Sequence, residues 1–305
     1  MKAARSVKVR TKWGRKLKRK VVPPKIKTEG DDISLSGPIR LGQIKDTFAG
    51  RSFNSVDFRD TNFIDLQIAY AICQATSIRS IGIWSNISRA AFSRLMNAEG
   101  LQEALVSGFA GSGRFRDFAS ANAVVDFRSF YGLNGLDLVE IANLPNLISL
   151  TAHGAEFGTK AMQRLAEMPT LRQVDLEAVT ITDEMSRALS KSRSVTDVVV
   201  PATRLTKMGL RHISEMPQLR YIDIWANNFQ ANALEMFAGH PALEIVELGT
   251  MGYDPDRVLH ARDIIPQLEK LPKLTTVYFE NVATTDEECA YLKSRYTFRL
   301  MQEKH

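Results

Sequence analysis

The chain has 305 residues, of which 44% are hydrophobic, so it can bury the core of one large domain or two ordinary ones. No apolar run approaches the ~20 residues that span a bilayer, and none of secretory length follows the basic amino end, so we expect neither a transmembrane helix nor a signal peptide. The net charge of +6 conceals two opposite parts. Residues 1–28 carry twelve lysines and arginines and no acid, which leaves 28 basic and 34 acidic residues for the rest.

Residues 1–30 are predicted to be a basic, disordered tail, because blocks of like charge rarely fold. The candidate contacts to nucleic acid or another polyanion in this tail are Lys16, Lys18, Arg19 and Lys20. Lysine and arginine release phosphate counterions on binding, which favours an arm that contacts RNA or DNA. Three other interpretations stay open: a solvated tail, a membrane-surface contact, and a mitochondrial transit peptide, in which more serine would be usual.

The rest of the chain, residues 31–305, is predicted to be one solenoid of about ten repeats. Its first part, residues 50–135, is irregular. The candidate strands there have apolar residues at the first, fourth and sixth positions and begin at Phe53, Ile78, Leu101 and close to Val125. The glycine-rich segment 108–114 lacks the Gly-Lys-Ser/Thr ending of a phosphate-binding loop, so we interpret it as a loop of an irregular repeat.

Residues 140–250 repeat every 24 residues. The fourth positions of five successive units are predicted to be the centres of neighbouring parallel strands: Leu150, Val174, Val198, Ile222 and Val246. A proline lies two residues before the first position of most units, where it ends the preceding helix and favours extended backbone. Apolar pairs at i,i+3, such as Leu210 and Ile213, predict a short helix after each strand, with Thr182 and Thr206 as N-caps.

An insertion near residues 250–270 lengthens the next unit, and one more strand pattern follows at Leu274, Val277 and Phe279. We interpret the inserted segment around Tyr253 to Asp256 as a tolerated loop, although insertions in repeats sometimes carry binding.

The motif Leu-x-x-Leu-x-Leu, followed by x-x-(Asn/Cys/Thr)-x-Leu, resembles that of the leucine-rich repeat family. Asn86 and Asn227 match the asparagine position of the motif. Other residues hold this position in other units, namely Thr61, Thr203, Ala155 and Val179. This is more similar to the helix-backed, ribonuclease-inhibitor-like or cysteine-containing subclasses. The resemblance implies an α/β leucine-rich-repeat solenoid, a horseshoe with a parallel sheet on its concave face and short helices on its convex face.

The residues between the apolar positions are predicted to face the concave side, where a partner would bind. These candidate partner-binding residues are Tyr221, Asp223, Trp225, Asp175, Glu177, Asp197, Glu247, Tyr278 and Trp84. Strand alternation puts Tyr221, Asp223 and Trp225 on one side, and we expect Asp197 and Glu247 to flank Asp223. The acids are expected to be solvated, and a charged face that serves solubility alone is the competing interpretation. Exposed tryptophan and tyrosine favour a binding surface.

No motif predicts catalysis, a cofactor or a metal site. Cys73 and Cys289 fall in different predicted repeats, which favours free thiols in the cytoplasm or another reducing compartment, with mitochondrial import as a minor alternative. The predicted function is therefore a non-enzymatic module that binds a protein on its concave face, in its sharper form an inhibitor or immunity-like partner of a basic protein. The alternative is a nucleoprotein component whose basic arm contacts RNA or DNA. The sequence does not fix the oligomeric state.

Overall fold

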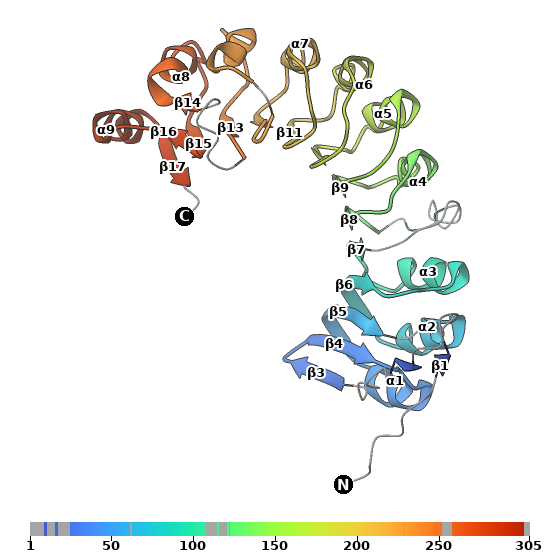
Figure 1. Cartoon of the computed structure of the whole chain (residues 1–305). Helices are drawn as coiled ribbons and strands as arrows, with labels where there is room; N and C mark the ends of the chain where they lie inside the picture. The colour runs from blue at the N-terminus through green and yellow to red at the C-terminus, as the bar shows by residue number, and fades with distance from the viewer. Residues whose placement is uncertain are drawn as a thin grey trace. The chain divides into compact units, whose positions relative to one another are not determined.

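The computed structural model describes residues 25–61, 63–107, 115, 121, 123–227, 229–251 and 258–301, together with the backbone of 9–10 and 16–17. The chain divides into two units, Met1–Gly108 (unit 1) and Phe109–His305 (unit 2), and each is described by itself. In both, a strand is followed by a short helix, and this pair repeats along the chain, with strands on one side and helices on the other (Figure 1).

Unit 1 contains a sheet in the order β3-β4-β5-β6-β7, in which only β3 and β4 pair antiparallel. Its strands are β3 (Lys25–Glu29), β4 (Asp32–Gly37), β5 (Ser52–Thr61), β6 (Ser77–Trp84) and β7 (Glu103–Ser107). Its helices are α1 (Leu41–Phe48), α2 (Leu66–Ile72) and α3 (Arg89–Met96). A separate two-stranded antiparallel pair joins β1 (Val9–Arg10) and β2 (Lys16–Leu17).

Unit 2 contains a parallel sheet in the order β8-β9-β10-β11-β12-β13-β15-β17. Its strands are β8 (Asp126–Phe130), β9 (Ser149–His153), β10 (Gln173–Asp175), β11 (Asp197–Val199), β12 (Tyr221–Asp223), β13 (Ile245–Gly249), β15 (Thr276–Glu280) and β17 (Thr297–Met301), with the short pair β14 (Leu259–His260) and β16 (Val282–Ala283) apart from them. Its helices are α4 (Gly135–Ile141), α5 (Thr159–Ala166), α6 (Asp183–Leu189), α7 (Lys207–Ser214), the 3-10 helix η2 (Ala231–Phe237), α8 (Ala261–Leu268) and α9 (Asp286–Arg295).

The predicted strand register is confirmed. Val174 pairs with Val198, Val198 with Ile222, and Ile222 with Val246, each across neighbouring parallel strands. The residues at the sixth position, Leu176, Val200 and Ile224, are buried. The predicted caps are also found, since Thr182 accepts a hydrogen bond from Met185 N and Thr206 from Gly209 N. The apolar period and the caps therefore predicted both the parallel strands and the start of the helices that follow them.

The sheets extend beyond the predicted strands. Strand β3 lies inside residues 1–30, which were expected to be a tail, and β4 and β17 were not predicted. In β4, Ile33 and Leu35 are buried at alternate positions, so this strand adds a layer to the core although its 24-residue motif is incomplete. The glycine-rich segment 108–114 and the insertion at Tyr253 to Asp256 lie outside the described residues.

The turn after each strand is held differently in the two units. In unit 2, the buried side chain of Asn227 accepts hydrogen bonds from Thr203 N and Leu205 N through Oδ1 and donates to Val200 O through Nδ2, at 3.2, 3.1 and 2.7 Å. In unit 1, Ser85 Oγ accepts from Thr61 N at 2.9 Å. The prediction that Asn86 holds this position was wrong by one residue, because the Asn86 side chain is exposed and Ser85 makes the contact.

The backbone of unit 2 turns through a positive φ directly after the strand face. Ala178, Ala202 and Ala226 have φ values of 58°, 54° and 56°, and Gly154 has 57°. An L-residue pays about 1–2 kcal/mol in this left-handed region, so the repeat imposes the conformation against the preference of alanine. Among the described residues, no helix is long and apolar enough to cross a membrane.

Candidate functional site

The candidate site is the open face of unit 2, defined as the side chains of β8–β17 that alternate with the buried core positions and lie on the side of the sheet away from the helices. The register groups them into rows across the strands. The central row runs through Asp175, Val199, Asp223, Glu247 and Tyr278. Neighbouring members are about 4.8 Å apart in the hydrogen-bonding direction of a sheet, close enough for their charges and rings to interact.

The expected neighbours of Asp223 were only half right. Glu247 pairs with Asp223 as predicted, but Asp197 pairs with Tyr221, and the other neighbour of Asp223 is Val199. A repeat of 24 residues makes residue 199 the partner of Asp223, and Asp197 lies two residues before this position. Asp197 accepts a hydrogen bond from Thr196 Oγ1 at 2.8 Å and lies in the next row.

Asp223 is buried, with only 8% of its surface exposed, although its side chain belongs to the open face. Its Oδ1 accepts a hydrogen bond from Trp225 N at 2.8 Å. Burial, together with the smaller effect of the charges of Glu247, Asp175 and Glu280, raises the pKa of Asp223 to about 7, although the hydrogen bond from Trp225 N lowers it. The expectation that all acids of this face are solvated was therefore wrong at Asp223.

Tyr221 reaches across the strand gap to Glu247. Its hydroxyl donates a hydrogen bond to Glu247 Oε2 at 2.8 Å. Burial, this hydrogen bond and the surrounding acids raise the pKa of Tyr221 well above its usual range, so the hydroxyl stays protonated and continues to donate. The pair fixes both side chains beside Asp223 and leaves the carboxyl of Asp223 outside this hydrogen bond.

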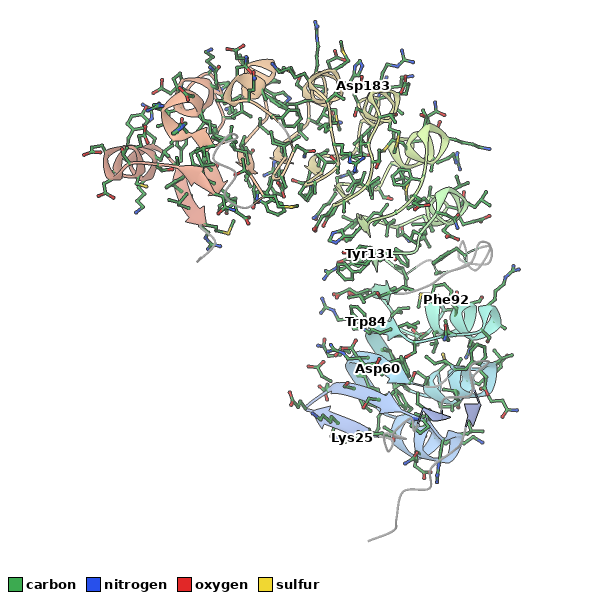
Figure 2. All side chains as sticks on the ribbon, in the orientation of Figure 1. Lys25, Asp60, Trp84, Phe92, Tyr131 and Asp183 are labelled. Carbon is green, nitrogen blue, oxygen red and sulfur yellow. The ribbon has the colours of Figure 1, made fainter. Side chains whose placement is uncertain are left out.

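Trp225 follows β12 in the turn and is partly buried, and its indole Nε1 is buried with no hydrogen-bond partner among the described residues. Trp84, at the end of β6 in unit 1, is 38% exposed and lies on the strand side (Figure 2). The structure thus places the two predicted tryptophans in different units and leaves more of Trp84 accessible. Continuing the register beyond β12 places Gly249 beside Trp225, so no side chain occupies that neighbouring position.

His153 is a residue of this face that the sequence interpretation missed. Its Nε2 lies 2.9 Å from Asp175 Oδ2, and its Nδ1 lies 3.5 Å from Glu177 Oε2. Burial lowers the pKa of His153, but the hydrogen bond and charge of Asp175, together with the charge of Glu177, outweigh it and raise the pKa. The 24-residue period could have found this contact, because it places residue 153 opposite residue 177.

The basic residues at the start of the strands are already engaged. Arg220 pairs with Glu244 at 2.7 Å, and Arg172 donates to the carbonyl oxygens of Pro169, Leu171 and Ser194. Beyond β13, Arg299 lies 5.9 Å from the ring centre of Tyr278. Within the described ranges, no lysine or arginine forms an ion pair with Asp175, Asp223 or Glu247. The centre of the open face therefore carries acids without a basic counterpart of its own, apart from His153.

The remaining predicted contacts lie elsewhere. The described part of the tail includes Lys16 only as backbone in β2, and Lys18, Arg19 and Lys20 lie outside the described residues. In the part of the chain that the structure covers, no three histidines, cysteines or carboxylates gather into a metal-binding group.

The repeats and their parallel sheets define a leucine-rich-repeat solenoid. No protein-family model matches the chain, and no curated protein matches it. Among solved structures, the chain is similar to an internalin from Listeria monocytogenes, with 13% identity, a TM-score of 0.51, and coverage of 89% of this chain and 86% of that one. At this identity, the likeness supports the fold, and the chemistry of the open face has to be argued from its own residues.

Proposed function

We propose that this chain is a non-enzymatic protein-interaction module that binds a protein partner on the open face of unit 2. The observation that carries the proposal is the central row itself, in which Asp175, Asp223 and Glu247 lie beside Tyr221, Tyr278 and Trp225 without a lysine or arginine partner within the described residues. Solenoids of this kind present extended surfaces that suit a protein-sized ligand. Aromatic side chains supply the area that anchors such interfaces.

The partner is proposed to be basic, and in its sharper form the chain is an inhibitor or immunity-like partner of a basic protein. Complementary charge steers association and excludes acidic competitors. We also propose that the repeats are of the helix-backed, ribonuclease-inhibitor-like or cysteine-containing type, which the short helices after most strands support.

The test begins with the partner captured by the parent protein from its native source, whose affinity is then measured for two variants. Trp225→Ala is expected to weaken binding by at least ~2 kcal/mol, the scale of an interface hot spot. Because Trp225 is partly buried, affinity must be measured at a temperature where both variants are folded. Met208→Ala, on the exposed surface of α7, is the control and should bind like the parent. Equal affinity of Trp225→Ala and the parent would contradict the proposal.

A second function is favoured by one observation, the twelve basic residues and no acid in residues 1–28. We propose as the alternative that this segment contacts RNA or DNA while the open face binds a protein. Affinity for a polyanion should then fall steeply with salt, and a chain without residues 1–28 should lose it. Equal retention of both chains on a polyanion column would exclude this function.

We propose a reducing compartment as the site of action. Cys73 and Cys289 are free thiols, and burial raises the pKa of Cys73, which keeps it in the unreactive thiol form.

A further inference from the structure

The carboxyl of Asp223 has one oxygen that accepts a hydrogen bond and, among the described residues, one oxygen without a donor. Asp223 Oδ1 accepts a hydrogen bond from the backbone amide of Trp225, whereas no residue in the described part of the chain donates a hydrogen bond to Asp223 Oδ2. Only 8% of Asp223 is exposed, so water has little access to this side chain. Ionising a carboxyl is costly when most of its side chain is shielded from water and one oxygen lacks a donor, and the carboxylate is stabilised when a charged donor reaches that oxygen.

Among the described residues, the charged and titratable groups that face Asp223 are acids or a tyrosine. Asp175 contributes from β10, Glu247 from β13 and Glu280 from β15. Tyr221 on its own strand donates to Glu247, and Asp197 on β11 neighbours Tyr221. The charges that act on Asp223 are therefore negative, which favours a positive group at the oxygen without a donor.

Two aromatic residues of β12 and its turn bracket this position. Tyr221 and Trp225 lie two residues before and after Asp223, on the same side of the strand by alternation. Gly249 brings no side chain to the position beside Trp225, because a Cβ at this residue would lie 1.9 Å from Glu280 O. An ammonium or guanidinium group near these rings would gain cation–π attraction besides the carboxylate contact.

We propose that Asp223 is the seat for a single lysine or arginine side chain of the protein partner, held by the free oxygen of the carboxyl and flanked by Tyr221 and Trp225. This inference rests on the proposed function and names the chemistry of its anchor. The charged head would donate to Asp223 Oδ2, and its aliphatic stem would lie along the rings. The surrounding acids would contribute attraction at longer range.

Proton release follows from this arrangement. With a pKa of about 7, Asp223 holds a proton in part of the molecules at neutral pH. A cation binds only the ionised form well, so binding expels that proton, and affinity rises with pH until Asp223 is fully ionised. A partner carbonyl bound by the protonated carboxyl would produce the opposite dependence on pH.

The experiment uses the full chain and two short, acetylated and amidated peptides that differ at one position. One peptide has lysine between leucine and tyrosine residues, and the other has norleucine in its place. Dissociation constants are measured by calorimetry from about pH 6 to pH 8, and binding at the open face is located from the NMR shifts of Trp225. Asp223→Asn removes the seat while keeping the shape of the side chain, and Asp263→Asn, at an exposed position of helix α8 outside the open face, is the matched control. Thermal unfolding verifies that both variants are folded.

We expect the parent to prefer the lysine peptide by at least about tenfold, and this preference to grow as pH rises through about 7. Asp223→Asn should lose the preference and its pH dependence, whereas Asp263→Asn should keep both. Equal binding of the two peptides at the open face would overturn the seat and leave the proposed function intact. A preference that survives in Asp223→Asn, or that falls with rising pH, would overturn it as well. If neither peptide binds while the captured partner still depends on Trp225, the seat is refuted and the proposed function stands.

Discussion

The two units build the same repeat by different means. In unit 2, strands β10, β11 and β12 are three residues long, and a left-handed turn follows each of them. The side chain of Asn227 holds the turn after β12 through several hydrogen bonds. In unit 1, β5 and β6 are ten and eight residues long, and Ser85 makes the equivalent contact. The side chain that holds the turn after β12 therefore makes more hydrogen bonds than the side chain that holds the turn between β5 and β6.

The acids on the strand faces of the two units also differ in their surroundings. On β5, Asp57 is exposed in part and pairs with Arg59 at 3.0 Å. On β12, Asp223 is buried and has no lysine or arginine partner within the described residues. An exposed ion pair contributes little to stability or to binding, but an unpaired buried carboxylate influences both. The comparison therefore supports the open face of unit 2 as the proposed binding surface.

The largest effect is expected from the sixth position of the strand motif, which holds Phe58 in β5 of unit 1 and Ile224 after β12 of unit 2. Phe58→Ala should lower the free energy of unfolding by about 3–5 kcal/mol and Ile224→Ala by about 2–5 kcal/mol, because both side chains are buried. Denaturant unfolding with hydrogen exchange would measure the loss and locate it near the altered repeat. Phe63→Ala, at an exposed position, is the control and should change stability by less than about 0.5 kcal/mol. A melt of Ile224→Ala like that of the parent would refute the register.

The next effect separates the two ways of holding the turn. Asn227→Ala should cost about 3 kcal/mol, because several buried backbone groups lose their partner. Ser85→Ala should cost about 1 kcal/mol, since one amide loses its acceptor. Chemical unfolding of the two variants tests this directly. Equal losses of unfolding free energy in the two variants would show that the number of lost hydrogen bonds does not set the cost.

The acids of the two faces should respond differently to pH. The folded pKa of Asp223 is about 7, above that of a carboxyl in the unfolded chain, so the folded state keeps a proton that the unfolded chain releases. Its contribution to stability is fully present below about pH 4 and is lost as pH rises through about 7. Asp223→Asn should therefore stabilise the protein by about 1–3 kcal/mol at pH 8 and much less at pH 5. His153, whose folded pKa is also raised, adds a loss in the same direction.

Asp57→Asn is the matched control for this pH experiment, because Asp57 belongs to an exposed ion pair. It should change the free energy of unfolding by less than about 0.5 kcal/mol across the same range. Thermal or chemical unfolding between pH 5 and pH 8 measures both variants. A gain in Asp223→Asn that is independent of pH would show that the carboxyl is ionised throughout.

The smallest effect concerns the left-handed turns. Ala178→Gly should stabilise the protein by about 0.5 kcal/mol, because glycine relieves the cost of a φ of 58° but loses more freedom on folding. Asp60 has a similar φ in unit 1, and Asp60→Gly should stabilise the protein by less than Ala178→Gly does, because aspartate tolerates this conformation better than alanine. Ala290→Gly in helix α9, an exposed helical site, should instead cost about 1 kcal/mol. Destabilisation by Ala178→Gly would mean that the turn carries no strain.

The sequence predicted the parts that depend on local periodicity. The 24-residue spacing predicted the strand centres from Leu150 to Val246, and the threonine caps followed from helix-start rules. Strand β4 was not predicted because Ile33 and Leu35 alone do not make a period, and their burial depends on the neighbouring repeat. The contact of Ser85 was not predicted either, because the motif places its asparagine at residue 86 and the structure uses the residue before it.

The open face shows where sequence reasoning ends. Alternation alone put Tyr221, Asp223 and Trp225 on one side of a strand, because successive side chains point to opposite faces. The burial of Asp223, the bond from Tyr221 to Glu247 and the close approach of His153 to Asp175 were decided only by the tertiary structure. Each depends on which side chain of a neighbouring repeat fills the space beside it. A period fixes which residues face that space, but the shape and charge of the residues across the strand gap decide how much water remains there.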